Sequence, residues 1–320
     1  MDSRRGGCAG DGSGAGRDRA YRHAGCRGDV ACPAAGVGGP AELNLPDFTA
    51  TTPLAVALDL DETTLGSDSR LADRTRRALH AVYNAGLPLV IATSRPERVL
   101  SMLVGDDIVE ITSLVQMNGT IANGRAGLTG SFSVPFDRED ARLCWGMVNE
   151  TIPQARMTME IDGTLFAVNH DDGINSLWAF NTASPTMVVP VEEAIDVGPA
   201  KISVNGLGTD LEELANELET QLSNKTVIHR AASAQFLNVV PRAATKSGAI
   251  ASLLGTADIS LADVLAFGDD YVDIDLIRDC GWSVAVDNAV PEIKSLAKYL
   301  TASNDDYGVA IVLERLVAAS

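Results

Sequence analysis

The chain has 320 residues, 46% of them hydrophobic, and a formal net charge of −18 at pH 7. This length and composition allow a substantial core, in one large domain or two smaller ones. The acidity argues against nucleic acid as a partner, because phosphate-backbone binding needs a basic surface. No run of about eighteen apolar residues occurs, so we expect no membrane span.

Residues 1–45 are rich in Gly, Ala, Arg and Cys, and we predict a disordered tail because they can bury little apolar surface. They contain no apolar segment typical of a secretory signal. The gaps between Cys8, Cys26 and Cys32 match no common zinc motif. Five cysteines without disulfide-framework spacing favour a reducing, cytoplasmic location.

An uninterrupted apolar run at 54–58 predicts a buried parallel strand that ends at Asp59 and Asp61. Ligands of open α/β sheets bind beyond the carboxyl ends of such strands. A carboxylate pair there is costly unless a hard divalent cation balances its charge. Taken alone, the pair fits an acid-rich surface turn equally well.

A helix is expected at 71–85, and a second buried strand follows at 86–92. This strand ends at Thr93, Ser94 and Arg95. A guanidinium suits the geometry of a phosphate group, which makes the end of this strand a candidate phosphate contact.

Another helix is expected near 96–104, and a third apolar stretch, 111–117, ends at Asn118. Residues 121–126 predict a hairpin closed by an Asn-Gly turn. Strands that alternate with helices predict a parallel sheet with right-handed crossovers.

Thr93 and Lys246 lie 246 − 93 = 153 residues apart, too many for one crossover connection. The intervening sequence has helix and strand patterns of its own, at 137–150, 157–168, 201–205, 209–214, 226–229 and 235–240. We therefore predict an α/β cap domain at 135–239, inserted into a core made of 46–134 and 240–320.

Two later segments complete a set of four motifs. Lys246 is a lone lysine that opens a helix. A strand at 264–268 ends in an acid cluster that contains Asp269, Asp270 and Asp273.

In this order, the motifs resemble those of the haloacid dehalogenase superfamily of aspartate-nucleophile phosphatases, and most closely its Cof-type subfamily. The likeness covers residues 54–315, and the C-terminal stretch 288–310 is also similar to that subfamily. The resemblance implies an α/β fold, with a Rossmann-like parallel-sheet core and a mobile cap that sets substrate specificity.

The resemblance also implies roles for the motif residues. Asp59 matches the nucleophile that forms an aspartyl-phosphate, and Asp61 matches the general acid and base. Thr93 and the Ser94 amide would bind the transferring phosphoryl group. Lys246 would neutralise charge on that group and orient Asp59.

Mg²⁺ is the implied cofactor, held by the Asp59 carboxylate, the Asp61 carbonyl and Asp269. Asp273 would be either a direct ligand or a partner of the ligands. The candidate substrate-binding residues are Thr93, Ser94, Arg95, Asn118 and Lys246.

The chain departs from the family pattern at three positions. Glu62 stands where Cof-type members usually have Gly, and Ser94 stands where Gly usually follows the threonine. Val272 replaces an asparagine that hydrogen-bonds within the site, and each group left unpaired could cost about 1–3 kcal/mol. Asp270 could compensate for that loss.

The expected function is hydrolysis of small phosphorylated metabolites, such as sugar phosphates, flavin mononucleotide or pyridoxal phosphate, by a monomer or homodimer. One alternative is a sugar-phosphate-specific phosphatase or a phosphomutase. A second is a weakly active protein that binds phosphorylated metabolites or has a regulatory role. His80, His170 and His229 show no catalytic or metal spacing, and we assign them structural or surface roles.

Overall fold

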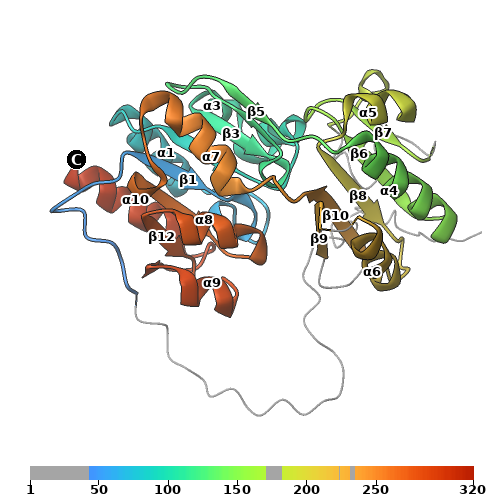
Figure 1. Ribbon diagram of the computed structural model, residues 1–320. Coiled ribbons are helices and arrows are strands. Elements are labelled where there is room, and N and C mark those ends of the chain that lie inside the picture. The colour runs from blue at the N-terminus through green and yellow to red at the C-terminus, as the bar shows by residue number, and fades with distance from the viewer. Residues whose placement is uncertain (1–42, 171–181, 223, 231–234) are drawn as a thin grey trace, which may run out of the picture. The chain divides into compact units, whose positions relative to one another are not determined.

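The structure is a computed structural model that describes residues 43–170, 182–222, 224–230 and 235–320. The tail predicted at residues 1–45 lies outside these ranges, apart from its last three positions. The described strands form two separate sheets, one of eight strands and one of five (Figure 1).

The first sheet has the strand order β13-β12-β11-β1-β2-β3-β4-β5. Its first six strands in this order are mutually parallel, and β4 and β5 add an antiparallel edge. The strands are β1 (Ala55–Leu58), β2 (Leu89–Ala92), β3 (Thr112–Gln116), β4 (Ile121–Asn123), β5 (Ser131–Ser133), β11 (Val264–Gly268), β12 (Trp282–Ala285) and β13 (Tyr299–Leu300).

Helices supply apolar side chains to both faces of this sheet. Val56 and Leu58 lie in one core cluster with residues of α1 and α10, whereas Ala55 and Ala57 lie in another with residues of α7. Because both faces are buried, β1 is apolar throughout. The helices are α1 (Asp73–Asn84), α2 (Leu100–Val104), α3 (Asp106–Glu110), α7 (Lys246–Leu254), α8 (Ile274–Asp279), α9 (Pro291–Leu296) and α10 (Gly308–Ala319).

The expected Asn-Gly hairpin turn at residues 123–124 is wrong. β4 and β5 do pair, but residues 124–130 connect them. The tight turn is instead Asn118–Gly119, between β3 and β4, where both residues have positive φ (62° and 90°). Both Asn-Gly pairs fit such a turn locally, and strand pairing decides which one is used.

The second sheet is antiparallel and has the order β7-β6-β8-β10-β9. It has its own hydrophobic core, to which α4, α5 and α6 contribute. Ile202 and Val204 belong to that core, so the alternating residues Lys201 and Ser203 lie on the opposite face. The elements are α4 (Arg138–Thr151), β6 (Arg156–Glu160), β7 (Phe166–Val168), α5 (Val191–Val197), β8 (Lys201–Asn205), α6 (Glu212–Gln221), β9 (Thr226–Arg230) and β10 (Phe236–Pro241).

The α/β class and the parallel-dominated first sheet confirm the expected fold. All strands of the second sheet lie between Arg156 and Pro241, within the long stretch that separates two halves of the first sheet. The exact limits of the inserted domain, 135–239, stay a prediction.

Candidate active site

Three neighbouring strand ends bring the predicted site residues together. β1 pairs with β2 on one side and with β11 on the other, all in parallel. Asp59 follows β1, Thr93 follows β2 and Asp269 follows β11. Residues far apart in the sequence therefore meet at one edge of the sheet, as expected for a ligand site in an open α/β sheet.

Lys246, at the first position of α7, connects two buried carboxylates. Its Nζ donates to Asp59 Oδ1 and to Asp273 Oδ1, both at 2.6 Å. The lysine is 1% exposed, and the two aspartates are 5% and 0% exposed. A buried ion pair of this kind fixes the orientation of the carboxylates, because each charge depends on its partner.

Acidic groups outnumber basic groups in this cluster. Asp59, Asp269 and Asp273 offer oxygen atoms that all lie within 4.8 Å of one another. Burial, followed by repulsion from Asp273, raises the pKa of Asp59 to about 8 although Lys246 opposes the shift. Burial, followed by repulsion from Asp59, raises the pKa of Asp269 to about 9. One ammonium group therefore leaves the three carboxylates undercompensated.

The donor set fits a hard divalent cation, which prefers carboxylate oxygens. Asp273 Oδ1 accepts from Lys246, and its Oδ2 accepts from the backbone N–H groups of Asp269 (3.1 Å) and Asp270 (3.3 Å). Of the two roles predicted for Asp273, these contacts favour that of a partner of the ligands. Asp59 and Asp269 are then the carboxylates best placed to hold the metal, and Thr63 Oγ1 orients Asp269 by donating to its Oδ1 at 2.7 Å.

Asp61 lies next to the cluster in sequence, but its carboxylate has a different partner. Arg95 Nε donates to both of its oxygens, at 3.0 and 2.8 Å, and Arg95 Nη2 donates to Oδ1 at 2.6 Å. The Asp61 side chain is 37% exposed and that of Arg95 is 12% exposed. The two motif residues thus form a bidentate pair at the border of the buried cluster.

Three of the predicted phosphate-binding residues, Thr93, Ser94 and Arg95, lie in the loop after β2, and Asn118 reaches this loop from the turn between β3 and β4. Thr93 is fully buried, and its Oγ1 accepts from the Arg95 N–H at 3.1 Å. The Asn118 N–H donates to the Thr93 carbonyl at 3.1 Å. Among the described residues, Asn118 Oδ1 is one of the few buried side-chain atoms without a hydrogen-bond partner. A substrate group could supply that partner, since buried acceptors are rarely left unpaired.

Two glycines permit close approaches that position the cluster. A Cβ at Gly119 would lie 2.2 Å from the Thr245 carbonyl oxygen, directly before Lys246. A Cβ at Gly268 would lie 2.7 Å from Asp273 Cβ. Neither distance is tolerable, so the lysine and the aspartate depend on these residues for their places.

Val272 does not leave the groups around it unpaired. Asp273 receives the two backbone N–H groups and the lysine, and Asp270 Oδ1 accepts from the Tyr271 N–H at 2.7 Å. Within the described ranges, no side-chain atom of the acid cluster is among the buried atoms without a partner. The unpaired hydrogen-bonding groups expected from the missing asparagine are therefore not seen at these residues.

The sequence interpretation missed a second ionic cluster, which joins the loop after β2 to the polar face of the second sheet. Lys201 Nζ donates to the Ser94 carbonyl at 2.9 Å. Arg98 donates to the Glu160 carboxylate at 2.6 and 2.7 Å. The alternation of polar and apolar residues in β6 and β8 could have revealed this cluster, because it places the polar residues opposite an apolar face.

Burial lowers the pKa of two basic side chains in this region. Desolvation lowers the pKa of Lys201 to about 8, although Glu160 opposes the shift. Desolvation, followed by Lys246 and Lys201, lowers the pKa of His229 to about 4. His229 therefore lies within the electrostatic influence of the site lysine, which the sequence did not indicate.

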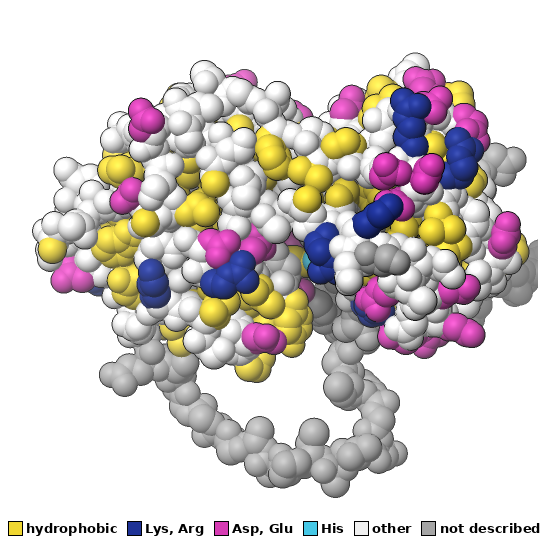
Figure 2. Space-filling model, in the orientation of Figure 1, with side chains coloured by type: hydrophobic (Ala, Val, Ile, Leu, Met, Phe, Trp, Pro, Cys, Tyr) yellow, Lys and Arg dark blue, Asp and Glu magenta, His cyan; other side chains and the backbone are white. Residues whose placement is uncertain are grey.

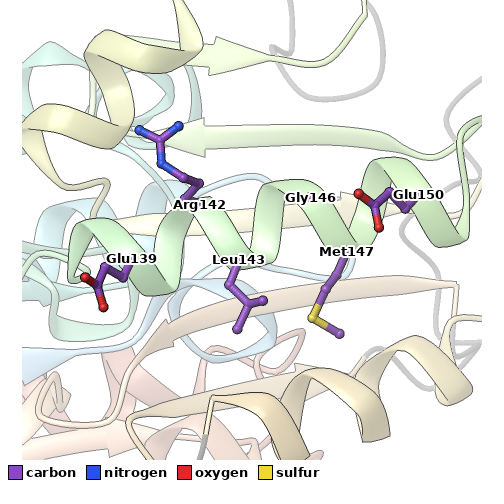
Figure 3. A pocket seen from close by; sticks show the side chains of 6 residues that line it. All are labelled: Glu139, Arg142, Leu143, Gly146, Met147 and Glu150. Atoms are coloured by element: carbon purple, nitrogen blue, oxygen red, sulfur yellow. The ribbon is translucent and has the colours of Figure 1, made fainter.

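A pocket of about 370 Å³ lies on α4 and contains no predicted site residue (Figure 3). It is lined by Glu139, Arg142, Leu143, Gly146, Met147 and Glu150. On the face shown in Figure 2, Lys and Arg side chains lie among Asp and Glu side chains. No described helix is both long and apolar enough to cross a membrane.

Known proteins provide an independent comparison. A phosphatase of 5-amino-6-(5-phospho-D-ribitylamino)uracil from Bacillus subtilis is 23% identical over 82% of this chain and 98% of its own length. An HMP-PP phosphatase from Yersinia pseudotuberculosis is 27% identical over 74% of this chain and 85% of its own length.

Among solved structures, a haloacid dehalogenase-like hydrolase from Bacteroides thetaiotaomicron superposes with a TM-score of 0.69 at 23% identity, over 83% of this chain and all of its own. The family model of the haloacid dehalogenase-like hydrolases matches residues 56–313. The family and the enzyme class that the four motifs predicted are thereby confirmed: the chain belongs to the haloacid dehalogenase-like hydrolases.

Proposed function

We propose that this hydrolase is an Mg²⁺-dependent phosphatase that cleaves small phosphorylated metabolites through an aspartyl-phosphate on Asp59. The observation that carries the proposal is the fixed Asp59 carboxylate, held by Lys246 at 2.6 Å beside Asp269. Phosphoryl transfer needs a positioned nucleophile and charge neutralisation more than any other contribution, and this cluster offers both.

In the proposed reaction, an Asp59 carboxylate oxygen attacks phosphorus and the phosphorus–oxygen bond to the leaving alcohol breaks. Asp61, which takes up a proton from solvent once it is released from Arg95, donates that proton to the leaving oxygen. Asp61 then accepts a proton from water, whose oxygen attacks phosphorus and returns Asp59 as a free carboxylate with inorganic phosphate. A bound Mg²⁺ would supply charge neutralisation between the carboxylates and the phosphate.

The ion pair between Arg95 and Asp61 is the arrangement from which the proposed reaction would begin. Arg95 holds both oxygens of Asp61, so the carboxylate is turned toward the loop after β2. A guanidinium also binds phosphate in a bidentate manner. We expect substrate phosphate to draw Arg95 away and free Asp61 to reach the leaving oxygen.

Substrate choice is assigned to the inserted domain, proposed at residues 135–239. Its polar face carries Thr158, Ser203 and Asn238 in register on adjacent strands. Hydrogen-bonding side chains of this kind suit the polar body of a sugar or ring phosphate. Two relatives are named as phosphatases of 5-amino-6-(5-phospho-D-ribitylamino)uracil and of HMP-PP, which supports a small phosphorylated metabolite as the substrate.

The test is release of inorganic phosphate from sugar phosphates, flavin mononucleotide, pyridoxal phosphate and para-nitrophenyl phosphate. Each would be assayed with Mg²⁺, with chelator, and with Asp59→Asn. The matched control is Asp107→Asn, which changes a surface aspartate paired with Arg76 and His80. Activity that needs both Mg²⁺ and Asp59 supports the proposal. Activity that survives Asp59→Asn refutes the aspartyl-phosphate route.

A further inference from the structure

The turn that carries Asp61 contains a residue in an unfavourable backbone conformation. Residues Leu60–Thr64 form one irregular helical turn, in which Glu62 has φ 55° and ψ 5°. A side chain with a Cβ rarely adopts this left-handed region, where glycine is at ease. The direction of the Asp61–Glu62 peptide, and with it the aim of Asp61, depends on this strained residue.

Two asparagines from the C-terminal part of the chain contact this turn. Asn288 Nδ2 donates to the Glu62 carbonyl at 2.6 Å. Asn304 Nδ2 donates to the Leu65 carbonyl at 3.0 Å and to Glu62 Oε2 at 3.4 Å. The Asn304 N–H donates to Asn288 Oδ1 at 2.9 Å, so the two asparagines also hold each other.

The segment that presents Asn304 is itself firmly held. Asn304 is only 9% exposed, and Asp305 Oδ1 accepts from the Ser67 N–H at 2.8 Å, just beyond the turn. Thr301 Oγ1 donates to the Gly308 carbonyl at 2.8 Å. A Cβ at Gly308 would lie 2.0 Å from the Ala302 carbonyl oxygen, so the segment closes tightly on itself. It can therefore act as a rigid support for its hydrogen-bond partners.

We propose that Asn288 and Asn304 are positioning residues that hold Glu62 in its left-handed conformation and thereby aim Asp61. The inference rests on the proposed phosphatase function for its catalytic consequence. Without the two asparagines, Glu62 relaxes toward a right-handed or extended conformation, which rotates the peptide that follows Asp61. Neither asparagine touches the substrate in this assignment.

The test compares Asn288→Ala and Asn304→Ala in the natural chain and in a Glu62→Gly background. In the natural chain, kcat falls about tenfold to a hundredfold while KM changes less than about twofold, because a misplaced catalytic group mainly affects the chemical step. In the Glu62→Gly background, the loss shrinks to less than about threefold, because glycine adopts positive φ without help. Equal losses in both backgrounds would overturn the inference.

Asn44→Ala is the matched control, since Asn44 Nδ2 donates to the Lys298 carbonyl at 3.0 Å and does not contact the turn. Its kcat stays unchanged in both backgrounds. Asn288 is exposed, so its variant tests the idea even if Asn304→Ala fails to fold.

Thermal unfolding gives a readout that needs no turnover. Each asparagine variant lowers Tm more in the natural chain than in the Glu62→Gly background, because the hydrogen bonds offset strain only where strain exists. Additive shifts in Tm would contradict the proposed role of Asn288 and Asn304 in holding Glu62. If the natural enzyme is inactive but the Tm shifts are non-additive, the phosphatase proposal is refuted and the role of the two asparagines in holding Glu62 still stands.

Discussion

Two buried clusters in this molecule hold unequal numbers of acidic and basic groups, in opposite senses. At the end of β1, three carboxylates surround one ammonium group, that of Lys246. At the loop after β2, Arg98 and Lys201 are set against the single carboxylate of Glu160. Both clusters combine buried charges with hydrogen bonds, yet one is short of a cation and the other is short of an anion.

The difference indicates what each cluster lacks. Uncompensated buried charge is unfavourable unless a ligand supplies the missing sign. We expect a divalent cation to complete the first cluster, and an acidic group on the body of a substrate, apart from the phosphate under attack, would suit the second.

The sharpest test of the comparison removes one lysine from each cluster. Lys246→Met leaves Asp59 and Asp273 buried without their cation, and we expect a loss of about 3–5 kcal/mol in the free energy of unfolding and no activity. Lys201→Met leaves Arg98 on Glu160, so the expected loss is about 1–2 kcal/mol. Urea denaturation of both variants measures the contrast, and equal losses would contradict it.

A second prediction concerns how the stability contributed by the acid cluster depends on pH. The pKa values of Asp59 and Asp269 are raised to about 8 and 9, so the folded metal-free protein holds protons that the unfolded chain releases near pH ~4. The contribution of these two groups to stability is therefore fully present below pH ~4 and is lost as the pH rises through about 8 and 9. Mg²⁺ should restore stability at high pH, where the carboxylates are ionised.

Tm measured in chelator and in Mg²⁺ between pH 5 and pH 9 tests this sign. Asp269→Asn serves as the control, since it removes one raised carboxyl and should flatten the metal-free profile. A metal-free Tm that rises across this range, with no change in Asp269→Asn, would show that the cluster is not undercompensated.

Two buried threonines provide a smaller, matched contrast, because each is 1% exposed. Thr63 Oγ1 donates to Asp269, whereas Thr158 Oγ1, on β6, has no hydrogen-bond partner among the residues that the structure describes. With Mg²⁺ present, so that Asp269 is ionised, Thr63→Val should cost about 1.5–3 kcal/mol, the range for hydrogen bonds to charged groups. Thr158→Val should change stability by less than about 0.5 kcal/mol or increase it, because no hydrogen bond is lost. Thermal denaturation of both variants ranks the two hydroxyls.

The smallest effect is expected at Val272. Asp273 already has three donors in the structure, so an added asparagine amide is not needed to hold it. Val272→Asn should change kcat by less than about threefold. A gain of one or two decades in steady-state rate would instead show that valine impairs the site and would revive the weakly active alternative.

The sequence alone determined the family, the parallel core and the identity of the acid cluster. The reason is local: each motif sits at the end of an apolar strand or the start of a helix, and parallel strands bring their carboxyl ends together. Asp59, Thr93 and Asp269 could be placed in this way without knowing any distance.

Only the tertiary structure decided the partners of those residues. Asp61 pairs with Arg95, and Asp273 faces Lys246. Lys201 reaches the Ser94 carbonyl. These contacts depend on side-chain directions, which strand patterns do not encode. The choice between two Asn-Gly pairs for the hairpin turn was likewise made by strand pairing. Strand and helix patterns follow from short-range periodicity, whereas charge pairing depends on contacts between distant residues, such as Lys246 and Asp59, which are 187 positions apart.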